Sequence, residues 1–355
     1  RQPLGRPSER RAESTNQTER NNCVMKNEQK TEPQQPDGQP APAARKPIDL
    51  VCFLICMALC FIWGLQQVAI KAAAEDVSPM LQVGVRSGIA ALLLYGWNRF
   101  VAKEAWSRSV KLRDAILVGL GFTGEFLFVA EGLRFTSASH MSVLLYTAPL
   151  FAAVGLSIRL PEERLSVLQW LGLCLAFFGI ALAFLVPALL ESTPAGSDLW
   201  LFGDFLGLCA GLSWGLTIIF LRTTTMNDAK PTQMLFAQLA TGFVVLFPFA
   251  LLSGQNVFHS SVVGWSSLLF QTLIVSFASY LVWCGLLKRY LAARLGVLIF
   301  VTPIFGVVLS ILLLGETIGP TFVAGSLCVL AGLLLVQGTD VLKRLFGRRR
   351  RSGLR

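Results

Sequence analysis

Hydrophobic residues follow one another in stretches of about twenty residues from Ile48 to residue 337, separated by shorter polar segments. At a rise of about 1.5 Å per residue, an α-helix of that length crosses a hydrocarbon core of about 30 Å. Ten such stretches are present, and we predict a transmembrane helix in each: 48–70, 79–98, 114–133, 138–158, 165–186, 201–221, 232–252, 264–286, 292–314 and 320–337. The pattern predicts an all-α integral membrane protein.

Composition agrees with this prediction, because 54% of the 355 residues are hydrophobic, 15% are charged, and mean hydropathy is +0.59. Residues 1–47 are instead rich in Gln, Asn, Arg and Pro, which predicts a disordered tail. The tail has no apolar segment typical of a signal peptide. Because the chain does not begin with Met, Met25 is a candidate native start.

Basic residues are distributed unevenly between the loops that join the predicted helices. Twelve Lys and Arg lie in alternate loops, and the intervening loops contain only Lys71 and Arg134. By the positive-inside rule, both termini are predicted to be cytoplasmic, with a periplasmic linker at 187–200 and a basic cytoplasmic tail at 338–355. This placement explains the net charge of +10 without nucleic-acid binding, and it predicts a multi-pass protein of a bacterial inner membrane.

The sequence contains an internal repeat, because residues 48–186 and 201–337 align with an offset of 151–154 residues. Trp63-Gly64 matches Trp214-Gly215, and Pro79 matches Pro231. Three further matches support the alignment: Tyr146-Thr147-Ala148-Pro149-Leu150-Phe151 with Phe300-Val301-Thr302-Pro303-Ile304-Phe305, Glu163 with Glu316, and Gly172 and Gly179 with Gly325 and Gly332.

Five helices per repeat is an odd number, so the second copy enters the membrane from the opposite side. The repeats are then inverted and related by a two-fold axis in the membrane plane. Two inverted halves can exchange conformations, which opens a central site to either side in turn. The repeat therefore favours a transporter that works by alternating access.

Several of these residues resemble the EamA repeat of the drug/metabolite transporter superfamily. They are the Trp-Gly of the first helix, the Pro before the second helix with Arg86 seven residues later, the Pro of the fourth helix and the Glu that opens the fifth. The resemblance covers both repeats. It implies ten helices, a cavity between the halves, and export or import of amino acids, related metabolites or drugs.

Two polar residues at equivalent positions of the repeats are candidates for substrate binding. Arg86 lies about seven residues into the second predicted helix, and its counterpart is Gln238. A charge within a membrane helix faces the protein interior or water. Arg86 is thus expected either to bind a substrate carboxylate or to bond helix ends as a structural residue.

Glu125 is the acid nearest the middle of a predicted helix, and its counterpart is Ser279. A buried carboxyl group suits a site that couples transport to protons or binds an ammonium group. The alternative is a structural partner for Arg86. Glu131 and Arg134, at the end of the same helix, are expected to form an ion pair.

Other aromatic and polar residues within predicted helices are candidates for lining a cavity. They are Trp63, Gln67, Trp214 and Tyr280, although a single Trp can equally serve packing. Pro149 and Pro303 are expected to kink their helices, as hinges or as fixed bends. Glu163, Glu316 and Asp204 are expected to cap the N-termini of their own helices.

No pattern for a metal, a cofactor or catalysis is present. His140 and His259 lack Cys or acidic ligands at useful spacing, and Cys52, Cys56 and Cys60 share a helix face suited to packing. Nucleotide-binding signatures are absent, which favours a secondary transporter and not an enzyme. An integral membrane enzyme and a receptor or structural membrane protein remain alternatives. Substrate, direction, coupling ion and oligomeric state stay open.

Overall fold

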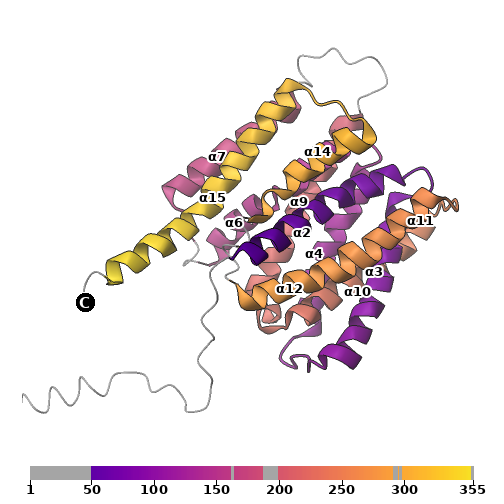
Figure 1. The fold of residues 1–355 in the computed structure, drawn as a ribbon, viewed down its shortest axis with the longest axis horizontal. Helices are drawn as coiled ribbons and strands as arrows, with labels where there is room; N and C mark the ends of the chain where they lie inside the picture. The colour runs from indigo at the N-terminus through magenta and orange to yellow at the C-terminus, as the bar shows by residue number, and fades with distance from the viewer. Residues whose placement is uncertain (1–48, 161–163, 187–198, 291–294, 296–297, 353–355) are drawn as a thin grey trace, which may run out of the picture. The chain divides into compact units, whose positions relative to one another are not determined.

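The computed structural model describes residues 49–160, 164–186, 199–290, 295 and 298–352, which form helices and no strand (Figure 1). The helices are α2 (Leu50–Ala72), α3 (Pro79–Trp97), α4 (Leu112–Gly132), α5 (Ala138–Leu145), α6 (Ala148–Arg159), α7 (Val167–Ile180), α9 (Leu199–Thr223), α10 (Pro231–Leu252), α11 (Val262–Leu269), α12 (Tyr280–Arg289), α14 (Thr302–Leu314) and α15 (Pro320–Ser352). A π-helical segment, η5 (Phe270–Ser279), joins α11 to α12.

Six helical segments are long and apolar enough to cross a membrane, and three shorter apolar helices accompany them in the described part of the chain. The six are Leu50–Ala72, Leu112–Gly132, Ala138–Arg159, Leu199–Thr223, Pro231–Leu252 and Val262–Leu286. The prediction of a multi-pass, all-helical membrane protein is confirmed, but ten spanning helices are not established. Part of the predicted span 292–314 and the segments 1–48 and 187–198 lie outside the described residues.

The sequence sets the starts of several helices through residues suited to a first turn. Asp49 and Ser137 accept hydrogen bonds from backbone N–H groups of α2 and α5, which would otherwise lack partners. Pro79 and Pro231 begin α3 and α10, where the missing N–H of proline costs nothing. At the other end of the chain, α15 continues past the predicted end at residue 337, because Leu, Lys and Arg favour helix.

Pro149 and Pro303, at equivalent positions of the two repeats, lie at helix starts, whereas kinks within continuous helices were predicted. α5 ends at Leu145, and Pro149 lies in the first turn of α6. Pro303 likewise lies in the first turn of α14. Proline disfavours continuation of a preceding helix, because its ring clashes with the backbone there and its N–H is missing. Each fourth segment is therefore broken, and a hinge at these points stays a prediction.

Glycines let helices of the two repeats approach closely. α7 and α15 lie side by side (Figure 1), and a Cβ added to Gly172 would lie 2.8 Å from the carbonyl oxygen of Gly332. Gly179 meets Gly325 in the same way, at 2.5 Å. The earlier glycine of α7 faces the later glycine of α15, so these two helices run antiparallel. Opposite directions of the fifth helices are what inverted repeats require.

A second pair of contacts repeats between equivalent helices. Gly64 of α2 packs on the backbone of Gly306 in α14, and Gly215 of α9 packs on Ala152 in α6. Gly64 corresponds to Gly215 in the repeat, and Ala152 corresponds to Gly306. The first helix of each repeat, α2 or α9, thus packs against the broken fourth segment of the other repeat, which contains α14 or α6, respectively.

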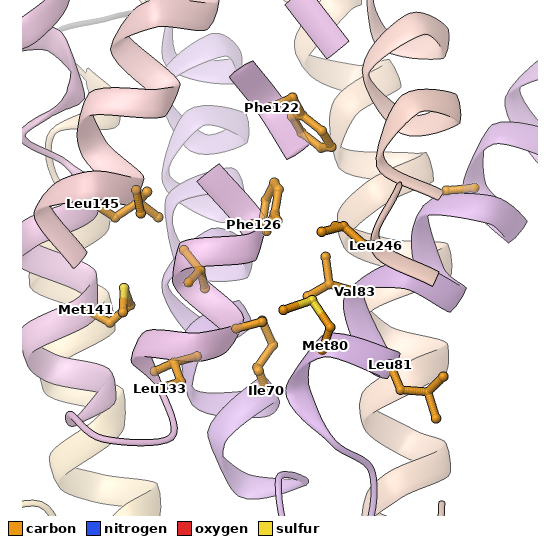
Figure 2. Close-up of a cluster of buried hydrophobic side chains, with 14 of the residues drawn as sticks. Ile70, Met80, Leu81, Val83, Phe122, Phe126, Leu133, Met141, Leu145 and Leu246 are labelled. Atoms are coloured by element: carbon orange, nitrogen blue, oxygen red, sulfur yellow. The ribbon is translucent and has the colours of Figure 1, made fainter. Parts of the chain in front are cut away.

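One hydrophobic cluster of the described residues joins helices of both repeats. Figure 2 shows Phe126 of α4 near Val83 and Met80 of α3, Ile70 of α2 and Leu246 of α10, all of which are buried. Each buried side chain of this size contributes about 1.5–3 kcal/mol where it leaves water, and in lipid the same contacts act through packing.

Two carboxylates of the second repeat hold the start of α5 in the first repeat. Glu316 accepts hydrogen bonds from the backbone N–H of Ala138 at 2.7 Å and of Ser139 at 3.0 Å. Asp204, inside α9, contacts Nδ1 of His140 at 3.1 Å and accepts from Thr136. The prediction that Glu316 and Asp204 cap their own helices is therefore wrong, because packing between repeats brings them to α5.

Two other expectations for charged residues can be compared with the structure. Glu163 lies outside the described residues. Arg134 Nη1 lies 2.7 Å from Glu131 Oε2, so the expected ion pair at the end of α4 is confirmed.

Gly179→Ala tests the contact between α7 and α15. The added Cβ would lie 2.8 Å from the Cβ of Cys328, so we expect a loss of about 1–3 kcal/mol of stability through overpacking. The measurement is thermal unfolding in detergent. Gly285→Ala is the matched control, since a Cβ there meets nothing within 4 Å. Equal melting temperatures for the two variants would show that the close contact is unimportant.

Glu316→Ala tests the cap that joins the two repeats at α5. Loss of the carboxylate leaves the N–H groups of Ala138 and Ser139 without this acceptor, and we expect a loss of about 0.5–2 kcal/mol. Thermal unfolding in detergent again measures the effect. Glu75→Ala is the control, because Glu75 is exposed. A Glu316 variant as stable as the control would contradict the role of this cap.

Candidate functional site

A cavity of about 380 Å³ lies among helices of both repeats. Side chains of α2, α4 and α5 line it from the first repeat, and side chains of α9, α10 and α12 line it from the second. Most lining residues are apolar or aromatic. The aromatic residues are Trp63, Phe122, Phe126, Tyr146, Trp214, Tyr280 and Trp283. Volumes of about 300–1,000 Å³ are typical of small-molecule sites.

Glu125 carries the one carboxylate among the described residues that line this cavity. It lies in the middle of α4 and is 6% exposed. Its electrostatic neighbours are the guanidinium of Arg86 on α3 and the hydroxyl groups of Tyr280 on α12 and Tyr146 at the end of α5. The geometry lets a ligand in the cavity contact this carboxylate directly.

Arg86 does not line the cavity, although it lies close to Glu125. It is fully buried, and its Nη1 donates a hydrogen bond to Oε1 of Gln271 at 3.3 Å. Its guanidinium carbon lies 4.2 Å from the ring centroid of Phe126, which itself lines the cavity. Phe126 therefore lies between the guanidinium and the cavity in this structure, and the expected contact between Arg86 and a substrate carboxylate stays a prediction.

A buried amide network lies next to Arg86 and binds the end of α2. Nε2 of Gln271 donates to Oε1 of Gln82 at 2.7 Å, and Nε2 of Gln82 donates to the carbonyl oxygens of Val77 at 2.7 Å and Ile70 at 3.2 Å. The network ties η5, α3 and the end of α2 together. Sequence reasoning did not identify Gln82, whose amide resembles that of many other buried polar residues.

The remaining candidate residues lie at or next to the cavity. Five of them line it: Trp63 and Gln67 of α2, Trp214 of α9, Gln238 of α10 and Tyr280 of α12.

Ser279 is not among the lining residues, but it holds one of them in place. The indole N–H of Trp63 donates to Oγ of Ser279 at 2.9 Å, and Oγ of Ser279 donates to the carbonyl oxygen of Val275 at 2.5 Å. Ser279 therefore fixes the orientation of Trp63 from behind the cavity surface.

Sequence reasoning missed Phe122 and Phe126, which line the cavity on either side of Glu125 along α4. A signal for them was present, because residues three and four apart share a helix face. Glu125 lies three residues after Phe122, and Phe126 lies four residues after Phe122. Their residue type alone gives no such signal, because phenylalanine also occurs on helix faces that are directed at lipid.

Comparison with known proteins places this architecture in a family. The model of the EamA-like transporter family matches residues 50–185 and 201–337, once for each repeat.

Similar proteins include a "Probable amino-acid metabolite efflux pump" of Salmonella typhimurium, 26% identical over 293 residues, which covers 79% of this chain and 93% of the relative. The protein of the same description in Escherichia coli is 24% identical, with 79% and 93% covered. The "Uncharacterized transporter YoaV" of Bacillus subtilis is 25% identical, with 79% and 94% covered.

A solved structure, described only as the crystal structure of a protein, has the same fold with a TM-score of 0.57 at 15% identity, covering 80% of this chain and 97% of that one. Both repeats match the family model and together span most of the sequence. The chain therefore belongs to the EamA-like transporter family.

Proposed function

We propose that this protein is a secondary transporter that exports amino acids or related small metabolites by alternating access. The observation that carries this proposal is a cavity at the junction of the two repeats whose described lining residues include one carboxylate, that of Glu125. Relatives described as probable amino-acid metabolite efflux pumps support export as the direction.

The arrangement that we propose is two inverted repeats of five transmembrane helices, 48–186 and 201–337. The antiparallel contact of α7 with α15 supports it, and so do the equivalent contacts of Gly64 and Gly215. The broken segments before Pro149 and Pro303 also occur at equivalent positions. In this arrangement, the two halves rock about the cavity, and each broken segment is the proposed hinge.

The cavity suits a substrate that carries an ammonium group on an apolar body. Glu125 is the proposed partner of the ammonium group, and aromatic rings such as Trp63 and Tyr280 can add cation–π attraction. The amides of Gln67 and Gln238 offer hydrogen-bonding groups for a second polar end of the substrate. Arg86 has no direct place in this set in the present conformation.

We further propose an inner-membrane location in bacteria with both termini in the cytoplasm. The proposal rests on the alternation of basic loops, with the linker 187–200 in the periplasm and the tails 1–47 and 338–355 inside. A proton carried by Glu125 on the return step is the alternative coupling mechanism, and the pH dependence of transport tests it.

An integral membrane enzyme is the less favoured alternative. Catalysis would need several acid, base or nucleophilic groups at one level of the membrane. Among the described lining residues, Glu125 is accompanied by aromatic, amide and aliphatic groups and by Cys284 and Thr217, with no histidine. A receptor or structural role would not require movement of the repeats, and substrate exchange in liposomes separates it from transport.

Glu125→Gln is expected to reduce transport of labelled amino acids in proteoliposomes by about tenfold or more, because a charge-assisted bond to the substrate is lost. If Glu125 carries a proton, the wild-type rate changes with pH and the rate of the variant does not. Glu131→Gln is the control, since Glu131 lies at the end of the same helix in its ion pair with Arg134. Unchanged rate and pH dependence in Glu125→Gln would remove this carboxylate from the mechanism.

Ser279→Ala is expected to raise the KM for the transported amino acid by about two- to tenfold, because Trp63 loses the acceptor that orients its ring. Initial rates of counterflow measure the effect. Ser266→Ala is the matched control, because Ser266 lies on the exposed side of α11 and its hydroxyl bonds only its own helix. An unchanged KM in Ser279→Ala would show that Trp63 does not need this support.

A further inference from the structure

Arg86 is a buried charge whose hydrogen-bonding capacity is only partly used. Nη1 donates to Gln271, whereas Nε and Nη2 are buried and have no hydrogen-bond partner in the described part of the chain. A buried charged donor without an acceptor is costly, particularly in the low dielectric of a membrane protein. These two nitrogens therefore point to an acceptor that another conformation provides.

Among the described residues, Glu125 is the acid that interacts with Arg86. Its carboxylate interacts electrostatically with the guanidinium of Arg86, yet the two groups form no ion pair within 4.0 Å. The ring of Phe126, the residue next to Glu125, lies against the guanidinium at 4.2 Å. Glu125 and Phe126 are consecutive residues of α4, so a movement of this part of α4 would change the separation of the two charges.

No other charged group on the neighbouring helices competes for this pair among the described residues. The further groups that interact with Arg86 or Glu125 are the hydroxyls of Tyr280 and Tyr146. Arg86 is thus the one cation for Glu125, and Glu125 the one anion for Arg86, in this part of the structure.

A purely structural role accounts for only part of the geometry. Gln271 is already held by its bonds to Gln82 and to Ser267, at 2.7 Å and 2.8 Å. Arg86 adds one bond of 3.3 Å to this network. Anchoring helices through Gln271 would leave Nε and Nη2 unused, and it would not require a charge.

We propose that Arg86 is an internal counter-ion that pairs with Glu125 when the cavity is empty and releases it when substrate binds. The inference rests on the proposed transport function. With substrate present, the ammonium group neutralises Glu125. Without substrate, Arg86 takes that place, so the empty protein can change conformation without an unpaired carboxylate inside the membrane. Arg86 is a positioning residue for the return step and does not itself contact substrate.

The test compares two modes of transport in proteoliposomes that contain the full chain and labelled phenylalanine, an ammonium on an apolar body. Net efflux into substrate-free buffer requires return of the empty protein, whereas exchange with phenylalanine on both sides does not. For Arg86→Met, we expect net efflux to fall by about tenfold or more while exchange stays within about twofold of wild type. An equal fall in both modes, or no fall in either, overturns the proposal.

Gln271→Met is the matched control, because it removes the hydrogen bond to Arg86 and keeps the charge. We expect the ratio of net efflux to exchange to equal that of wild type. If Gln271→Met reproduces the ratio of Arg86→Met, then helix anchoring explains the effect and the counter-ion role is wrong. Wild-type protein that neither exchanges nor releases phenylalanine would instead contradict the proposed function itself.

A second variant covers the case in which Arg86→Met does not give monodisperse protein. Adding Glu125→Gln removes the unpaired carboxylate, so the double variant is expected to recover folding, as measured by gel filtration and thermal unfolding. Recovery supports the pairing of the two charges. A double variant that is no better folded than Arg86→Met overturns it.

Discussion

Close backbone contact between helices of the two repeats is the constraint on which the rest of the structure depends. In lipid, apolar side chains gain little by leaving their solvent, so helices associate through tight packing at small residues. The clearest case is the contact of α7 with α15, where Gly172 meets Gly332 and Gly179 meets Gly325. Each of these glycines faces a carbonyl oxygen of the other helix. Any larger residue there would separate the halves.

The polar groups follow from the same packing. Glu316 can reach the start of α5 only because the second repeat is packed against the first. The cavity also has walls from both repeats, and the carboxylate of Glu125 is the one found among its described lining residues. A frame built from similar halves thus surrounds a site that is chemically unequal, with Glu125 in one half where Ser279 occupies the equivalent position of the other.

The length of the hydrophobic stretches, the internal repeat and the family resemblance were sufficient to predict a helical membrane transporter, since these features depend on residue order alone. Glu125, Trp63, Trp214 and Tyr280 could be selected because charged and polar aromatic side chains within membrane helices are candidates for lining a cavity. Phe122 and Phe126 were missed, because phenylalanine also faces lipid. The sequence could not place Arg86 behind Phe126, because the two lie on different helices whose rotation is set by packing. For the same reason, Glu316 was assigned to the helix that follows it in sequence, although it caps a helix of the other repeat.

The π-helical segment η5 explains why one helix can serve both the cavity and the buried charge beside it. Gln271 bonds Arg86, and Tyr280, nine residues later, lines the cavity and interacts with the same guanidinium. In a regular α-helix of 3.6 residues per turn, residues nine apart lie on opposite faces. A π-helix takes more residues for each turn, which brings the two side chains round toward a common face. With ordinary winding, one of them would be directed at lipid.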